Sequence, residues 1–160
     1  MSMKKYFITY ILTILMSMVG IEASAYDFKA TSDDGVTFFY NWIKDKTEVA
    51  VTYEGKTWVA TAGYTGDIKV PESVTYEGKT YPVTRIGYCA FFNCEITSIT
   101  IPRCVNTIGE GALGECIYLT SLFIPNTVTK IGDNAFQDCI GLTSIVVEDG
   151  NPNYDSRNNC

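Results

Sequence analysis

Short stretches of alternating apolar and polar residues return at regular intervals in the second half of the chain. In the segment Thr120–Ile124, the apolar residues Leu122 and Ile124 are separated by Phe123 and preceded by Ser121. Successive side chains of a β-strand point to opposite sides, so we expect Leu122 and Ile124 to point inward and Ser121 and Phe123 outward. The next residue is a proline, which ends the strand because it has no N–H for a ladder.

The residues after this strand predict the rest of one structural unit. Val128 and Ile131 form a second inward-facing edge, and Gly132 permits a corner. Residues 133–139 have the apolar spacing of one or two helical turns, with Asp133 as the N-cap. The side chains expected to reach the core from these turns are Ala135, Phe136 and Cys139.

The same order of residues occurs three times. A Val-x-x-Ile-Gly motif begins at Val83, Val105 and Val128, and the glycine and the later cysteine recur after 22 and then 23 residues. This period is typical of solenoids, whose units bury their apolar faces by stacking. We therefore predict a short right-handed α+β repeat solenoid over residues 67–160, with three clear coils preceded by a degenerate coil that begins near Ile68.

The first 25 residues have the pattern of a secretory signal peptide. Lys4 and Lys5 precede an uncharged apolar run, and Ala23-Ser24-Ala25 follows as a small-x-small cleavage site. The alternative is a membrane anchor, but the run of 16 residues is shorter than the roughly 20 that a bilayer span requires. We expect export with cleavage after Ala25, and no membrane span in the mature chain.

Residues 26–66 predict a β-rich N-terminal cap on the solenoid. Gly35–Trp42 and Glu48–Tyr53 are rich in β-branched and aromatic residues. The segment Thr52–Thr57 recurs unchanged as Thr75–Thr80, and its Glu-Gly pair between strand formers is typical of a tight hairpin turn.

The six cysteines allow two interpretations. Export to an oxidising compartment favours disulfides. However, Cys94, Cys116 and Cys139 share one register of the repeat, which favours a ladder of small buried thiols. The cysteines outside this register, which are the better candidates for pairing or for free reactivity, are Cys89, Cys104 and Cys160.

Composition excludes several kinds of chemistry. With 12 basic and 18 acidic residues and a net charge of −6, the chain has no basic cluster for nucleic acid. It contains no histidine, which removes histidine-based acid–base catalysis and most zinc sites. We therefore expect no catalytic residue, no metal and no cofactor.

Two weaker candidates for chemistry remain. Residues 149–155 carry oxygen ligands at calcium-like spacing, but they lack the glycine and glutamate of an EF-hand loop and also fit an ordinary polar turn. Glu54 and Glu77 lie in identical contexts and resemble a glycosidase pair. Each belongs to a predicted turn, where a solvated charge is expected, so we do not expect catalysis from them.

The repeat resembles a known family. The stretch Leu119–Cys139 is similar to the BspA-type leucine-rich repeat of bacterial surface proteins, in the pattern Leu-Thr-Ser-Ile-x-Ile-Pro-x-x-Val-x-x-Ile-Gly-x-x-Ala-Phe-x-x-Cys. The tail Asn153–Cys160 resembles an irregular coil of members from Bacteroidales. The resemblance implies a leucine-rich-repeat stack, export to the cell surface, periplasm or medium, and protein–protein or host adhesion. Relatives commonly carry more repeats, so we also expect a shortened form, or an open last coil that self-associates.

The outward side of the stacked strands is the candidate binding face. We call it the outer strand face, and its residues are Ser98, Thr100, Ser121, Phe123, Ser144 and Val146. Hydroxyls beside exposed apolar side chains suit a protein or glycan ligand on host or neighbouring cells. The simpler interpretation is that these residues are strand formers facing solvent. The competing function is a structural repeat fragment that self-associates in a larger surface assembly.

Overall fold

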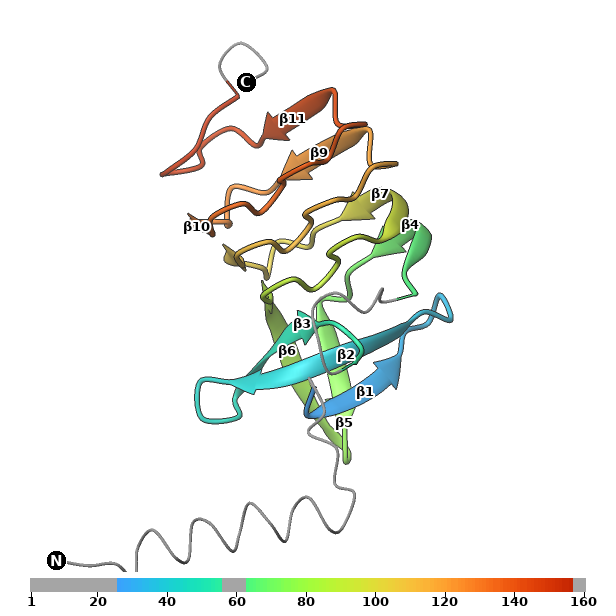
Figure 1. Ribbon diagram of the computed structural model, residues 1–160. Coiled ribbons are helices and arrows are strands. Elements are labelled where there is room, and N and C mark those ends of the chain that lie inside the picture. Colours follow the sequence, from blue (N-terminus) through green and yellow to red (C-terminus); the bar gives the residue numbers. More distant parts are fainter. Residues whose placement is uncertain (1–25, 56–62, 157–160) are drawn as a thin grey trace, which may run out of the picture.

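The computed structural model describes residues 26–55 and 63–156. The predicted signal peptide, the last part of the Thr52–Thr57 turn and Cys160 lie outside these residues. The described chain forms a stack of coils with an antiparallel meander at one end (Figure 1).

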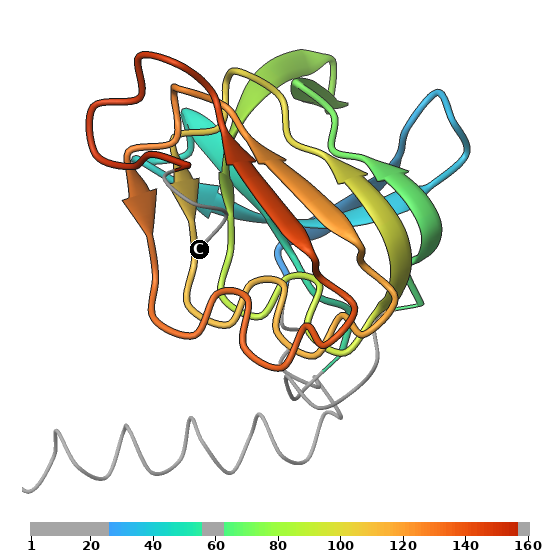
Figure 2. The same ribbon diagram turned by 90° about the horizontal axis from the view of Figure 1, so that it is seen from above.

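Two walls of parallel strands enclose the core of the stack. One wall contains β4 (Thr65–Lys69), β7 (Glu95–Thr100), β9 (Ser121–Ile124) and β11 (Ser144–Val147), with β4 paired to β7 and β9 paired to β11. The other wall contains β6 (Lys79–Ile86), β8 (Thr107–Ile108) and β10 (Lys130–Ile131). Figure 2, which looks along the stack, shows the walls on opposite sides of each coil.

The meander continues the second wall. It consists of β1 (Phe28–Thr31), β2 (Thr37–Ile43) and β3 (Glu48–Thr52), and β3 pairs in parallel with β6. The hairpin of β5 (Ser73–Tyr76) and β6 folds over its aromatic side chains. The rings of Phe28 and Tyr76 have centroids 4.3 Å apart.

The strands predicted from alternation are confirmed. Leu122 and Ile124 are each 2% exposed, whereas Ser121 and Phe123 face solvent. The predicted hairpin turn at Glu77-Gly78 also forms, with φ values of 50° and 76° at its two central residues. Positive φ at both positions matches the twist that two-residue hairpins require.

The predicted α+β class is wrong. The described residues contain strands and turns but no helix, so the molecule is an all-β repeat fold. Residues 133–138 form consecutive turns, in which Asn134 and Asp138 have φ values of 55° and 57°. A residue in the left-handed region interrupts a right-handed helix, and asparagine and aspartate adopt that region more readily than most residues.

Hydrogen bonds explain why turns replace helix at this corner. The N–H of Phe91 donates to the carbonyl of Ala112 in the next coil, and that of Leu113 donates to Ala135, each at 2.8 Å. The N–H groups at the intervening positions close local turns instead. The N–H of Cys116, for example, donates to the carbonyl of Leu113, three residues earlier. Alternate peptide groups therefore join neighbouring coils, which a helix would prevent by using those groups internally.

The three cysteines in register lie in the core, as the repeat predicts. Cys94, Cys116 and Cys139 are at most 8% exposed and occur as thiols rather than disulfides. The Cys116 thiol donates to the Phe91 carbonyl and the Cys139 thiol to the Leu113 carbonyl, each at 3.0 Å. Burial raises the pKa of Cys94 to about 12, so this side chain is neutral and behaves as a small apolar group.

Glycine permits close backbone contact between coils at one corner. Gly87, Gly109 and Gly132 occupy one corner of successive coils, and a Cβ added at Gly109 would lie 2.8 Å from the Gly87 carbonyl oxygen. The neighbours that a side chain would strike are backbone atoms, which cannot rotate away.

Gly109→Ala is expected to destabilise the protein by about 1 to 3 kcal/mol, because overpacking pushes two coils apart. The measurement is urea unfolding followed by circular dichroism. Gly63→Ala is the matched control, since an added Cβ there meets nothing within 4 Å and the residue has no positive φ. Equal losses in both variants would contradict steric crowding at the corner.

Candidate functional site

The outer strand face lies on one exposed side of the first wall. Ser121 pairs with Ser144 and Phe123 with Val146, so hydroxyls align in one column and apolar side chains in the next. Phe123 is 48% exposed and Val146 is 45% exposed. Residues two apart on a strand share a side, and parallel pairing in register repeats that side on the neighbouring strand. Ser121, Phe123, Ser144 and Val146 therefore lie on one side of two paired strands, and Ser98 and Thr100 are exposed on β7.

The structure adds Asp67 and Lys69 to this side of the wall. On β4 they pair with Ser98 and Thr100, which continues the columns towards the meander. The register shifts between Gly66 and Asp67, so that Thr97 is an additional residue on β7. This bulge turns the hydroxyls of Thr97 and Ser98 onto one Asp67 oxygen, at 2.8 and 2.7 Å.

These hydrogen bonds stabilise the ionised form of the Asp67 carboxyl. The bond from Ser98, followed by that from Thr97, lowers the pKa of the Asp67 carboxyl below its ordinary value. Asp67 is therefore negative at neutral pH, and it lies in the hydroxyl column that contains Ser98. The convergence of two hydroxyls on Asp67 depends on a bulge, for which strand alternation gives no signal.

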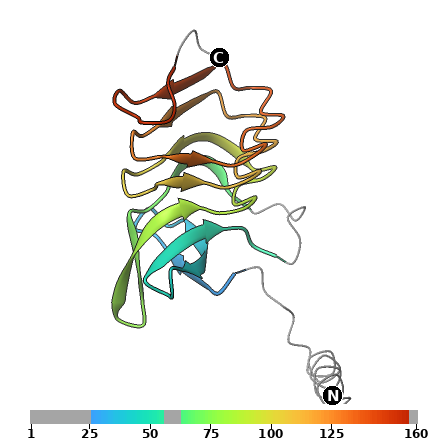
Figure 3. The ribbon, with the colours of Figure 1, turned by 90° about the vertical axis from the view of Figure 1, so that its left-hand side faces the viewer.

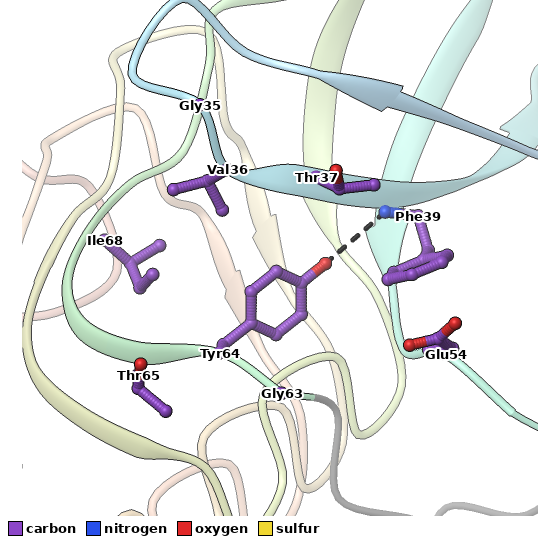
Figure 4. A pocket seen from close by; sticks show the side chains of 9 residues that line it. All are labelled: Gly35, Val36, Thr37, Phe39, Glu54, Gly63, Tyr64, Thr65 and Ile68. Carbon is purple, nitrogen blue, oxygen red and sulfur yellow. Dashed lines mark hydrogen bonds between the residues drawn. The ribbon is translucent and has the colours of Figure 1, made fainter.

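A separate pocket of about 320 Å³ lies between β2 and β4. Figure 4 shows Tyr64 at its centre, with its hydroxyl accepting a hydrogen bond from the Phe39 N–H at 3.3 Å. Burial raises the pKa of the Tyr64 hydroxyl above its ordinary value, so this group stays protonated. Glu54 lines the pocket, whereas Glu77 belongs to the β5–β6 turn and is not among the lining residues. The pocket therefore does not hold the two glutamates as a catalytic pair.

The segment with calcium-like spacing folds across the last coil. The Asn151 side-chain amide donates to the carbonyls of Pro125 and Val128, at 3.2 and 2.9 Å. Its oxygen accepts the N–H groups of Asn153 and Tyr154, both at 2.9 Å. This side chain organises a turn, and the described residues contain no group of three or more His, Cys, Asp or Glu side chains suited to a metal ion.

An ion pair joins this segment to earlier coils. The Arg103 guanidinium donates to both oxygens of Glu148, and one of these oxygens also accepts the Asn126 N–H at 3.0 Å. The three residues belong to three successive coils. The Asn126 N–H, followed by Arg103, lowers the pKa of the Glu148 carboxyl below its ordinary value of 4.5.

Comparison with known proteins identifies the repeat. The model of the BspA-type leucine-rich repeat region matches residues 67–157 in six copies, which is more than half of the chain. The chain belongs to the BspA-type leucine-rich repeat family. The resemblance stated from the sequence is thereby confirmed, although the family model divides the region into more units than the four coils predicted.

Two solved structures of leucine-rich repeat proteins are similar to this BspA-type protein. One, from Bacteroides ovatus, is 34% identical with a TM-score of 0.61, and the match covers 76% of this chain and 29% of the other. Another, from Bacteroides capillosus, is 24% identical with a TM-score of 0.54, covering 75% and 98%. This chain thus spans less than a third of the Bacteroides ovatus protein. No curated protein matches the sequence.

Within the described ranges of this BspA-type protein, no helix has the length and apolar character needed to cross a bilayer.

The ion pair of Glu148 predicts a pH-dependent contribution to stability. A carboxyl whose pKa is lowered by folding stabilises the native state above its unfolded pKa, and this contribution disappears as the pH falls through the folded pKa. Glu148→Gln is expected to lower the melting temperature at pH 7, and the difference from wild type should shrink below about pH 4.

Thermal unfolding followed by circular dichroism at several pH values provides the measurement. Glu77→Gln in the β5–β6 turn is the control, because its side chain forms no ion pair within the described part of the chain. A Glu148→Gln difference that stays constant down to pH 3 would contradict this role for the carboxylate.

Proposed function

We propose that this BspA-type leucine-rich repeat protein is an exported, non-enzymatic binding protein. It acts at the bacterial surface, in the periplasm or in the medium, and contacts a protein ligand through the outer strand face. The observation that supports this proposal best is the alignment of Phe123 and Val146, both about half exposed, beside a column of serine hydroxyls.

The chemistry of this face suits protein recognition. Aromatic side chains are enriched among the residues that dominate binding energy, and surrounding polar groups fix orientation. Asp67 supplies a negative charge beside Ser98 in the hydroxyl column, and Lys69, which lies 3.8 Å from an Asp34 carboxylate oxygen, pairs with Thr100. A repeat surface of this kind presents side chains at regular intervals across several strands.

A binding role is also consistent with the absence of histidine and with the separation of Glu54 from Glu77. Export rests on the signal-like pattern of residues 1–25. The competing proposal, a structural role through self-association, has one structural argument. β11 is the last strand of its wall within the described residues, so its outer edge has no paired strand there.

Phe123→Ala is expected to weaken binding to a matrix protein by about tenfold or more, since removal of a central aromatic contact commonly costs about 2 kcal/mol. The measurement is surface plasmon resonance of residues 26–160 against a panel of extracellular-matrix proteins. Ile140→Ala is the control, because Ile140 is 82% exposed but lies outside the outer strand face.

The outcomes separate the two proposals. Binding that Phe123→Ala weakens and Ile140→Ala preserves supports recognition through this face. Equal losses in the two variants would contradict the location of the site. Absence of binding across the panel, together with a mass that rises with concentration in light scattering, would overturn adhesion in favour of self-association.

A further inference from the structure

A groove of about 430 Å³ runs along the second wall of the stack, away from the outer strand face. It crosses β6, β8 and β10 and the residues that follow them, on the side of the molecule seen in Figure 3. Neither the family match nor the proposed function assigns a role to it.

The repeat builds this groove from equivalent positions of successive coils. Arg85, Thr107 and Lys130 occupy the same position on adjacent strands, because Arg85 pairs with Thr107 and Thr107 with Lys130. Ile108 and Ile131 also line the groove, as do Gly109 and Gly132, two residues after Thr107 and Lys130. The next position in each coil forms the opposite wall, with Tyr88, Glu110 and Asp133.

The first wall of the groove carries two cations. The side chains of Arg85 and Lys130 are exposed and form no ion pair or hydrogen bond with the described residues. Arg85 influences the Glu48 carboxyl only through a charge effect that is the weakest contribution at that group. In a protein with a net charge of −6, Arg85 and Lys130 therefore place a row of positive charge on one wall of the groove, opposite the carboxylates of the other wall.

The second wall offers an aromatic face and hydrogen-bond acceptors. Tyr88 is 49% exposed, and Glu110 and Asp133 are exposed as well. The backbone of this wall is fixed, since the carbonyls of Glu110 and Asp133 accept N–H groups of the preceding coil at 3.0 Å. The carboxylates would repel a ligand with dense negative charge, such as a polyphosphate, but they accept hydrogen bonds from hydroxyl and amide groups.

The spacing of the cations distinguishes between two extended ligands. Arg85 and Lys130 lie two strands apart, which corresponds to about 9.5 Å at the usual spacing of paired strands. Same-side residues of an extended peptide repeat at about 6.7 Å, which does not match. The carboxylates of a linear glycan with one uronic acid in each disaccharide recur at a distance comparable with two strand spacings.

We propose that this groove binds a linear acidic glycan that carries one carboxylate per disaccharide. Successive carboxylates pair with Arg85 and Lys130, and the Thr107 hydroxyl bonds the sugar between them. A sugar ring packs on Tyr88, while hydroxyl or N-acetyl groups donate to Glu110 and Asp133. The site is independent of the outer strand face, so one molecule can hold a protein ligand and a glycan at once.

Isothermal titration calorimetry with a hexasaccharide of alternating glucuronate and N-acetylglucosamine tests the proposal. Wild-type residues 26–160 should bind this probe, with an affinity that falls as salt rises, and should bind the neutral N-acetylglucosamine hexamer at least tenfold more weakly. The double variant Arg85→Gln/Lys130→Gln is expected to lose about tenfold or more of the affinity for the acidic probe.

The control is Lys29→Gln/Lys46→Gln, which removes the same charge from exposed residues outside the groove and outside the outer strand face. It should change the affinity less than twofold, and thermal unfolding verifies that each variant is folded. Equal losses in the two double variants would overturn the groove as the site, because net charge alone would then explain binding. Failure of wild type to bind the acidic hexasaccharide, or equal binding of the neutral hexamer or of an acidic peptide, would overturn the ligand class.

Binding of matrix proteins is measured separately in the same variants. Arg85→Gln/Lys130→Gln should leave it unchanged, and Phe123→Ala should leave glycan affinity unchanged. Failure of one site is therefore distinguishable from failure of the other.

Discussion

The close approach of successive coils at the glycine corner is the constraint on which the rest of the structure depends. Because Gly109 lies against the Gly87 carbonyl and Gly132 against Glu110, backbones meet without an intervening side chain. That proximity allows the Gly109 N–H to donate to Ile86 and the Gly132 N–H to Ile108, each at 2.8 Å. With the coils held at this distance, the thiols of Cys116 and Cys139 also reach carbonyls of the coil below.

The same constraint produces both surfaces discussed above. Stacking in register repeats each outward position on the neighbouring strand, which aligns Phe123 with Val146 on one wall and Arg85 with Thr107 and Lys130 on the other. On the second wall, Gly109 and Gly132 also line the groove. The corner at which backbones meet is therefore also part of an outer surface.

The sequence predicted the strands, the buried cysteines and the exposed side of β9 because each depends on local alternation or on the repeat period. It failed at residues 133–139, where apolar spacing alone cannot distinguish a helical turn from consecutive β-turns. Asn134 and Asp138 carried the information, since their side chains favour the left-handed backbone that ends a helix. The hydrogen bonds of Thr97 and Ser98 to Asp67 and the groove were not predictable in this way, because a bulge in one pair of strands and the juxtaposition of Arg85 with Lys130 arise only when coils are stacked.

In the segment after β11, side chains form hydrogen bonds to the preceding coil of the kind that peptide groups form between other coils. Asn151 and Asn153 donate to the carbonyls of Val128 and Thr129, and the Tyr154 hydroxyl accepts the Ile131 N–H. These hydrogen bonds all join the segment to the coil before it, and Glu148 also contacts Arg103 one coil earlier. A duplication of one whole coil between Gly87 and Gly109 would consequently leave the meander and the segment after β11 with the same neighbouring residues. Gene duplication can thus lengthen the two outer surfaces in equal steps, adding one strand to each wall.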